Sequence, residues 1–241
     1  MIAIKTQNLT KKYKDLVAVD NLNLTINQGE LISLLGINGA GKTTAIKMLT
    51  GLTKPTSGDA FLLDKSVIHD TLAVKSFIAL SPQETAIANG MTVKENLQLM
   101  CGVYGFSKTE TTKKIIELTK LLSLNDVLDK KGKTLSGGYQ RRLSIAMALI
   151  SEPKILFLDE PTLGLDVIAR SELWDIISEL KQKVTIILTT HYLEEAEALS
   201  DRIAIMKNGK LLVLDTADNI KKSTNTDNFE QAFISIVKGA K

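Results

Sequence analysis

One stretch of the chain limits its fold more than any other: Gly36-Ile37-Asn38-Gly39-Ala40-Gly41-Lys42-Thr43. It matches the pattern G-x-x-x-x-G-K-[ST], in which glycines let the backbone turn tightly and aim several N–H groups at one phosphate. The apolar run Leu31–Leu35 precedes the loop, as expected for a buried strand, and a helical pattern follows it. The motif therefore predicts a strand, a phosphate-binding loop and a helix N-terminus in this order.

The residues of this loop have distinct roles toward a nucleoside triphosphate. The Lys42 ammonium can reach the β- and γ-phosphates, and the Thr43 hydroxyl can ligate Mg²⁺. Thr44 offers a further donor near the α-phosphate. The expected nucleotide contacts in this region are Gly36, Asn38, Gly39, Ala40, Gly41, Lys42, Thr43 and Thr44.

Two acidic residues follow a second apolar run. Ile155-Leu156-Phe157-Leu158 is typical of a buried strand, and Asp159 and Glu160 come directly after it. A parallel strand that ends in carboxylates delivers them to the ligand-binding edge of the sheet. We expect Asp159 to lie near Mg²⁺ with water between them, and Glu160 to polarise the attacking water as general base. The alternative, an acidic pair that merely ends a strand, is disfavoured by the phosphate-binding loop upstream.

Strand and helix patterns alternate along much of the chain, which predicts an α/β core with a mainly parallel sheet. Early in the chain Leu22, Leu24 and Ile26 alternate with polar residues, as in one half-buried strand. Near the end, Asn208-Gly209 between two apolar runs predicts a tight hairpin.

A helical segment interrupts this alternation from about residue 88 to about residue 150. Thr92 and Ser107 each have a glutamate three residues later, which predicts capping boxes and therefore two helix starts. From about residue 218 the chain is polar and then weakly amphipathic, which predicts a short C-terminal tail.

Leu135-Ser136-Gly137-Gly138-Tyr139-Gln140 is the second specific motif. Taken alone, it places a serine N-cap and two glycines before a helix whose apolar face includes Leu143 and Ala146. A helix N-terminus with bare backbone is a second anion site. One nucleotide needs only one phosphate-binding loop, so the chain carries two sites where one would suffice.

With this motif the chain resembles the nucleotide-binding subunits of ABC (ATP-binding cassette) transporters, whose signature has the form LSGGQ. Tyr139 stands where Gln is usual, and we expect it to alter contacts at the helix edge and not the phosphate contacts of Ser136, Gly137 and Gly138. The resemblance covers nearly the whole chain and implies ATP and Mg²⁺ as cofactors.

The resemblance also assigns roles to four residues whose own signals are weak. Tyr13 falls where the family stacks an aromatic ring on adenine, and Gln83 at the loop glutamine that senses Mg²⁺ and the γ-phosphate. Asp166 lies in the segment that crosses the family's dimer interface, and His191 matches the switch histidine that contacts the γ-phosphate. Without the family, Tyr13 would be a packing aromatic, Gln83 a plain loop residue and His191 a structural histidine. The implied catalytic residues are Glu160, His191 and Gln83, and the implied metal contacts are Thr43, Gln83 and Asp159.

The implied fold is that of a P-loop NTPase: a RecA-like, mainly parallel core with an antiparallel β subdomain, plus an inserted α-helical subdomain. We expect one ABC ATPase domain over 1–217, with the core at about 1–87 and 151–217 and the helical subdomain at about 88–150. Residues 218–241 would form the tail.

The family further implies a head-to-tail dimer with a second copy of the chain or a paralogous ATPase. ATP on one P-loop would be covered by Ser136-Gly137-Gly138 of the other subunit, and a separate membrane permease would turn closing and opening into transport. No apolar run approaches the length of about 18 residues that a membrane helix needs. The first five residues lack the features of a secretion signal. We therefore expect a cytoplasmic protein, peripheral on the inner face of the cell membrane through the permease.

The segments around Met91–Phe106 and His191–Glu197 look like the subclass that powers small two-component exporters. An importer ATPase or a non-transport ABC ATPase is the alternative. The net charge of +3 is spread over dispersed Lys/Arg pairs, so no nucleic-acid partner is expected. Cargo contacts belong to the membrane partner, so the chain does not identify the cargo.

Overall fold

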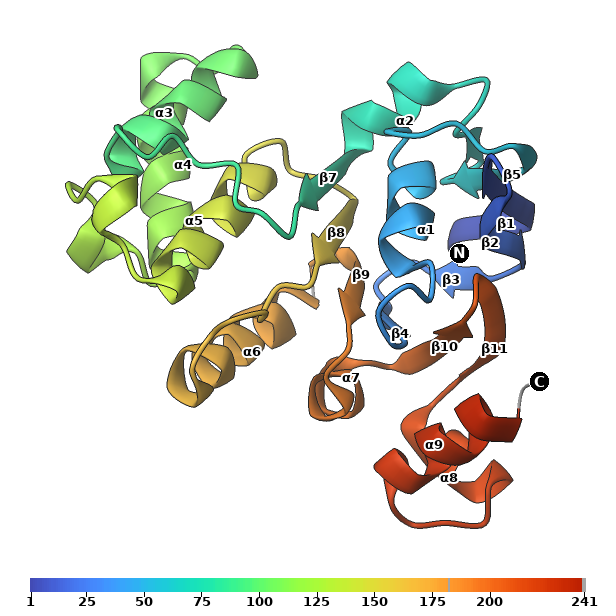
Figure 1. Ribbon diagram of the computed structural model, residues 1–241. Helices are drawn as coiled ribbons and strands as arrows, with labels where there is room; N and C mark the ends of the chain where they lie inside the picture. Colours follow the sequence, from blue (N-terminus) through green and yellow to red (C-terminus); the bar gives the residue numbers. More distant parts are fainter. Residues whose placement is uncertain (182, 240–241) are drawn as a thin grey trace.

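The computed structural model describes residues 1–181 and 183–239, whose strands form two sheets (Figure 1). The larger sheet has the order β11-β10-β4-β9-β8-β7, and all its neighbours are parallel except β10 and β11. This confirms the expected α/β class with a mainly parallel core. The strands of this sheet are β4 (Leu31–Leu35), β7 (Ile78–Ser81), β8 (Ile155–Asp159), β9 (Thr185–Thr190), β10 (Arg202–Lys207) and β11 (Lys210–Asp215).

The three central strands explain where functional groups gather. Every residue of β4, β8 and β9 is buried, because apolar runs suit strands covered on both faces. Parallel register aligns Leu35 of β4 with Thr190 of β9, and Asp159 of β8 with Thr189 of β9. The carboxyl ends of these strands therefore meet at one edge of the sheet.

The second sheet is antiparallel and corrects one expectation. The predicted single strand through Leu22, Leu24 and Ile26 has the expected burial but is two strands, β2 and β3, which pair with different halves of β1. At the break the Thr6 hydroxyl donates to Leu22 O (2.8 Å) and accepts from Leu24 N (2.9 Å), which replaces ladder bonds. The sheet consists of β1 (Ile2–Tyr13), β2 (Leu16–Leu22), β3 (Thr25–Asn27), β5 (Ser57–Leu62) and β6 (Lys65–Ser66). Helix α1 (Lys42–Leu49) lies between the two sheets, and α2 (Thr71–Phe77) follows β6 (Figure 1).

The inserted helical part contains α3 (Val93–Val103), α4 (Lys108–Leu121) and α5 (Gly137–Leu149), with 3-10 turns at Asn125–Val127 and Gly132–Thr134. Both predicted capping boxes are formed. These helices lie at one end of the parallel sheet (Figure 1) and share a core with α6 (Val167–Lys181), β8 and β9. No helix in the described part of the chain combines the length and apolar composition needed to cross a bilayer.

The C-terminal segment is more ordered than its composition suggests. The expected boundary at residue 217 falls inside α8 (Ala217–Ser223), and α9 (Phe229–Gly239) follows; residues 240–241 of the expected tail lie outside the described residues. Both helices pack on α7 (Leu193–Leu199), β10 and β11 (Figure 1), with Ile220, Phe229 and Ala232 buried. The weak amphipathicity expected of this segment is wrong for α9, which is clearly amphipathic and places its apolar face on this core.

We expect Ile220→Val to lower the free energy of unfolding by about 1 kcal/mol, because one buried methylene is lost. Ile220 is fully buried, whereas Ile234 of α9 is 40% exposed. The same change at Ile234 should therefore cost close to nothing. Urea denaturation of both variants measures the difference, and equal stability of the two would contradict the packing of α8.

Candidate active site

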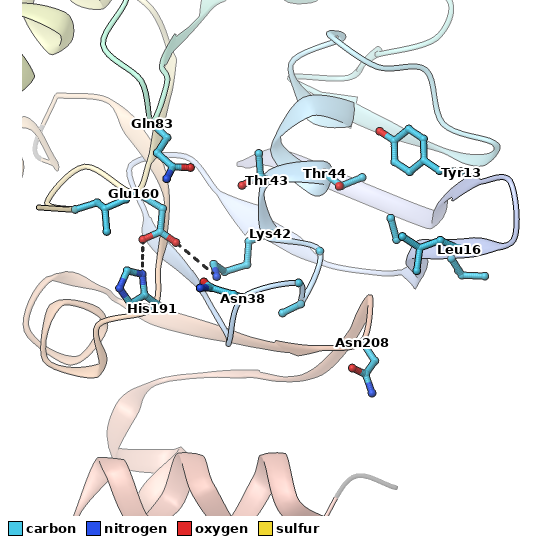
Figure 2. A pocket seen from close by; sticks show the side chains of 16 residues that line it. Tyr13, Leu16, Asn38, Lys42, Thr43, Thr44, Gln83, Glu160, His191 and Asn208 are labelled. Carbon is cyan, nitrogen blue, oxygen red and sulfur yellow. Dashed lines mark hydrogen bonds and ion pairs between the residues drawn. The ribbon is translucent and has the colours of Figure 1, made fainter.

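A cleft of about 680 Å³ lies at the sheet edge where β4, β8 and β9 end (Figure 2). The P-loop and the start of α1 form its floor, with Tyr13 and Leu16 at one end and Gln83, Glu160 and His191 at the other. The lining residues are Tyr13, Leu16, Val17, Ala18, Asn38, Gly39, Ala40, Gly41, Lys42, Thr43, Thr44, Gln83, Glu160, Leu163, His191 and Asn208. Gly36 precedes this floor at the end of β4.

The P-loop glycines are required by close backbone packing. Gly41 has φ +101°, and a Cβ there would meet Ala18 O at 2.4 Å. At Gly36 a Cβ would meet Met206 O at 2.4 Å. Because glycine alone fits these close approaches without a shift, the loop packs tightly against β10 and β2, and α1 begins directly after it at Lys42.

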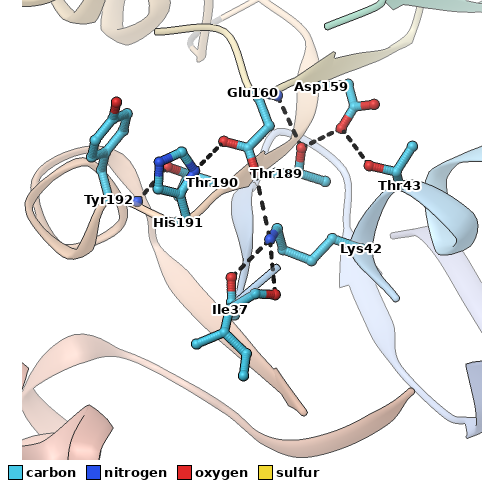
Figure 3. Close-up of polar contacts among 10 residues, drawn as sticks. Ile37, Lys42, Thr43, Asp159, Glu160, Thr189, Thr190, His191 and Tyr192 are labelled. Carbon is cyan, nitrogen blue, oxygen red and sulfur yellow. Dashed lines mark hydrogen bonds and ion pairs between the residues drawn. The ribbon is translucent and has the colours of Figure 1, made fainter. Parts of the chain in front are cut away.

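Lys42 and His191 both contact Glu160 (Figure 3). Lys42 Nζ donates to Gly36 O (2.7 Å) and lies 3.5 Å from Glu160 Oε1. His191 Nδ1 is 2.8 Å from Glu160 Oε2. One buried carboxylate therefore joins the residue expected to hold the phosphates to the expected switch histidine.

Asp159 and Glu160 point to different partners although they are adjacent. Glu160 has φ +49°, a conformation that costs a non-glycine residue about 1 kcal/mol or more and redirects its side chain. Thr189 Oγ1 donates to Asp159 Oδ1 (2.5 Å) and accepts from Glu160 N (2.9 Å), which stabilises this turn. The two carboxylates are thereby available for separate tasks.

Two of the three expected metal contacts lie side by side. Thr43 Oγ1 is 3.3 Å from Asp159 Oδ1, and Gln83 lines the same cleft. Hydroxyl, carboxylate and amide oxygens are hard donors of the kind that Mg²⁺ prefers. These side chains therefore fit Mg²⁺ bound together with phosphate.

Arg141 of α5 holds the loop that carries Gln83. Its guanidinium donates to Pro82 O and Gln83 O, both at 2.6 Å. Burial lowers the pKa of Arg141, while the nearby Asp159 and Glu195 carboxylates act in the opposite direction. The guanidinium stays charged because an arginine pKa starts far above neutrality.

The remaining expected contacts lie outside the cleft. Ser136 caps α5 by position, but its hydroxyl makes no capping hydrogen bond, and Gly137 and Gly138 open the helix. Asp166 accepts a hydrogen bond from Ala169 N (2.9 Å) at the start of α6, and a Cβ on Gly138 would meet the Ala169 side chain at 3.1 Å. The signature residues and Asp166 therefore form one neighbourhood, separate from the P-loop cleft of their own chain.

A family model described as "ABC transporter" matches residues 19–163, more than half of the chain. The chain belongs to the ABC transporter family. Daunorubicin/doxorubicin resistance ATP-binding protein DrrA of Streptomyces peucetius is 38% identical over 226 residues, which are 93% of this chain and 68% of that protein. The phospholipid-transporting ATPase ABCA3 of Homo sapiens is 41% identical over 212 residues, 86% of this chain. The chain spans only 12% of the length of ABCA3.

A solved structure agrees with this ABC assignment. The dimeric ATP-binding cassette MJ0796, in a post-hydrolysis state bound to ADP and Pi, superposes with a TM-score of 0.79 at 29% identity, over 88% of this chain and 98% of that one. The resemblance to ABC nucleotide-binding subunits is therefore confirmed, as is the P-loop NTPase fold. Nucleotide binding belongs to this family, whereas the roles of single residues in this chain stay predictions.

Sequence reasoning missed five residues of the ABC nucleotide cleft: Leu16, Val17, Ala18, Leu163 and Asn208. The structure exposes the apolar Leu16 and Val17 next to Tyr13, and exposed apolar pairs often contact ligands, but the sequence does not indicate this exposure. Asn208 lies in the predicted hairpin, but its nearness to the P-loop depends on the pairing of β10 with β4. The hydrogen bond from Gly209 N to Ala40 O (3.0 Å) fixes that approach.

Proposed function

We propose that this chain binds MgATP in the cleft and hydrolyses it to drive export through a separate membrane permease. The single observation that carries the proposal is the Glu160 carboxylate, which contacts both Lys42 and His191 beside the P-loop. Hydrolysis of a nucleoside triphosphate needs a general base next to a phosphate-binding loop.

Each residue has a defined part in this reaction. Lys42 and the P-loop N–H groups bind the β- and γ-phosphates, and Tyr13 offers a ring for the adenine. Thr43, Gln83 and Asp159 would hold Mg²⁺, which neutralises phosphate charge when bound. The oxygen of the attacking water bonds to the γ-phosphorus while Glu160 accepts a proton from this water. At the same time the bond between the γ-phosphorus and the oxygen that leaves with ADP breaks. His191 orients Glu160 and can donate to the γ-phosphate.

A head-to-tail dimer gives the signature residues a task. Ser136, Gly137, Gly138 and Asp166 lie outside the cleft of their own chain, and all of them except the buried Gly138 are exposed. Large apolar side chains around them are exposed, including Leu163 (37%) and Val167 (76%). A second copy that places these groups over the P-loop would complete its phosphate contacts, so ATP would favour the closed dimer. The dimeric structure of MJ0796 supports a dimer of this chain.

We propose that the chain is divided into a core at about 1–87 and 151–217 and a helical subdomain at about 88–150. An apolar groove of about 430 Å³ runs between them, bordered by Leu52 and Ile78 on the core side and Met100 and Tyr104 on the helical side. Leu52 and Tyr104 are exposed. We propose that a short helix of the permease docks in this groove, because an amphipathic helix buries its apolar face in such a surface. The protein would then be cytoplasmic and peripheral at the membrane.

The names of the relatives favour export. DrrA is described as a drug resistance protein and ABCA3 as a phospholipid-transporting ATPase. A drug or lipid-like cargo moved outward is therefore the proposal for this chain.

Capture of the permease tests the function and the groove together. The tagged chain, solubilised gently from membranes of its own host, should retain a polytopic membrane protein that lacks a cassette. Leu52→Asp and Tyr104→Asp should each reduce its recovery at least about tenfold, because a buried unpaired carboxylate is costly. Ile116 of α4 is exposed away from the groove, so Ile116→Asp is the matched control. Recovery of ribosomes or DNA alone would contradict the transport function, and recovery unaffected by the groove variants would contradict the docking site.

A further inference from the structure

A second buried carboxyl lies behind the Glu160–His191 pair. Glu195 of α7 is fully buried, and its Oε1 accepts a hydrogen bond from Trp174 Nε1 of α6 (3.1 Å). Within the described chain, Glu195 Oε2 and the equally buried Thr162 hydroxyl have no hydrogen-bond partner of normal geometry. A buried carboxyl with one oxygen left over is expensive, so its retention calls for a role.

The surroundings of Glu195 connect both partners of the catalytic pair. The hydroxyls of Thr162, which follows Glu160 by two positions, and Thr190, which precedes His191, face its carboxyl. The Thr190 hydroxyl also accepts from Tyr192 N (2.9 Å), directly after His191. One side chain thus approaches the backbone segment of Glu160 and that of His191, and is anchored to α6 through Trp174.

We propose that Glu195 is a positioning residue. It links the segment carrying His191 and the segment carrying Glu160 to α6, and so keeps the side chains of Glu160 and His191 in contact. The inference rests on the proposed function, because it concerns the geometry of the same hydrolytic site. Catalysis depends steeply on such geometry, and a displacement of about 1 Å can cost about 10²-fold in rate.

Its surroundings shift the pKa of the Glu195 carboxyl upward, towards the uncharged form. Burial raises its pKa, the nearby Glu160 carboxylate acts in the same direction, and the contacts with Thr190, Thr162 and Trp174 act against this. A protonated carboxyl has the shape of an amide, with one acceptor and one donor side. Side-chain length and hydrogen bonding should therefore matter more at this position than negative charge, even though the Arg141 guanidinium lies near enough to interact with the carboxyl.

Two substitutions separate reach from charge. Glu195→Gln keeps the length of the side chain and removes its charge, whereas Glu195→Asp keeps the charge and shortens the side chain. We expect the kcat of Glu195→Gln for ATP hydrolysis to lie within about twofold of the wild-type value. The kcat of Glu195→Asp and of Glu195→Ala should be about tenfold lower than that of the wild type. In all three variants the KM for ATP should stay within about twofold of the wild-type value. Trp174→Phe, which removes the indole donor, should also lower kcat. It serves as the kinetic test if Asp or Ala prevents folding, and Glu194→Ala, on the exposed face of α7, is the matched control.

The histidine content allows a direct structural readout. The chain has two histidines, and His69 is exposed far along the sequence from the site. In nuclear magnetic resonance spectra of protein labelled at histidine, the His191 signal should shift in Glu195→Ala and in Trp174→Phe. It should stay in place in Glu195→Gln and in Glu194→Ala. The His69 signal should stay in place in all of them.

Three results would overturn the role of Glu195: wild-type kcat in the Ala or Asp variant, a Gln variant as slow as Ala, or an unmoved His191 signal in a slow variant. Failure of the proposed function gives a different pattern, since the wild-type chain would then hydrolyse no ATP. The His191 signal still tests the positioning contact in that case, because it does not depend on turnover.

Discussion

Glu160→Gln should slow ATP hydrolysis by about 10²–10⁴-fold, the usual contribution of a general base, and should leave ATP affinity nearly unchanged. The amide keeps the shape of the side chain and a hydrogen bond to His191, 2.8 Å away in the native contact, but cannot accept the proton of the attacking water. Phosphate release measures turnover, and a fluorescent nucleotide measures binding. Glu179→Gln, at a solvated position of α6 paired with Lys183, should behave as wild type. Unchanged turnover of the Glu160 variant would end its assignment as base.

The same variant also tests the dimer, because slow hydrolysis preserves bound ATP. Its mass in solution should double on addition of MgATP. Ser136→Glu, added to the same chain, should prevent the doubling, since a carboxylate would then face the phosphates across the interface. A monomer in MgATP without the second substitution would remove the main support for a homodimer.

Lys42→Met is the second change with a large effect, and it acts on binding. Loss of a buried charged donor to phosphate costs about 2–5 kcal/mol, which corresponds to ATP binding weakened by a factor of about 30 to about 4,000. Methionine keeps most of the volume of the lysine stem, so the loop should retain its fold. Calorimetric titration with MgATP gives the affinity. Lys47→Met, on the exposed side of the same helix, is the control, and equal affinities of the two variants would refute the role of Lys42.

The sequence predicted the elements that local chemistry specifies. The P-loop requires its glycines, Thr92 and Ser107 cap helices with their own glutamates, and Asn208 and Gly209 both adopt positive φ in the hairpin turn. The strands β4 and β8 were recognisable because both faces are buried. These features depend on a few neighbouring residues, so one sequence suffices to find them.

Features that depend on distant partners were not predictable. The division of one alternating stretch into β2 and β3 depends on Thr6, sixteen positions before Leu22. The packing of α8 and α9 depends on a sheet face completed by β10 and β11. In the candidate site the network around Glu195 needs α6 and α7 to pack together, and no spacing along the chain announces the hydrogen bond from Trp174.

Helix α5 joins two places that serve different nucleotides in the proposed dimer. Its first residues, Gly137 and Gly138, would face the ATP of the partner, and Arg141, about one turn later, grips the carbonyls of Pro82 and Gln83 beside the chain's own ATP. A movement of the N-terminus of this helix towards the partner's ATP would therefore also displace Arg141 and the loop that carries Gln83. The two sites of the proposed dimer would then be mechanically linked through α5, whose contacts to the segment of Gln83 are the Arg141 guanidinium and the hydrogen bond between Ser144 and Ser81 (2.9 Å).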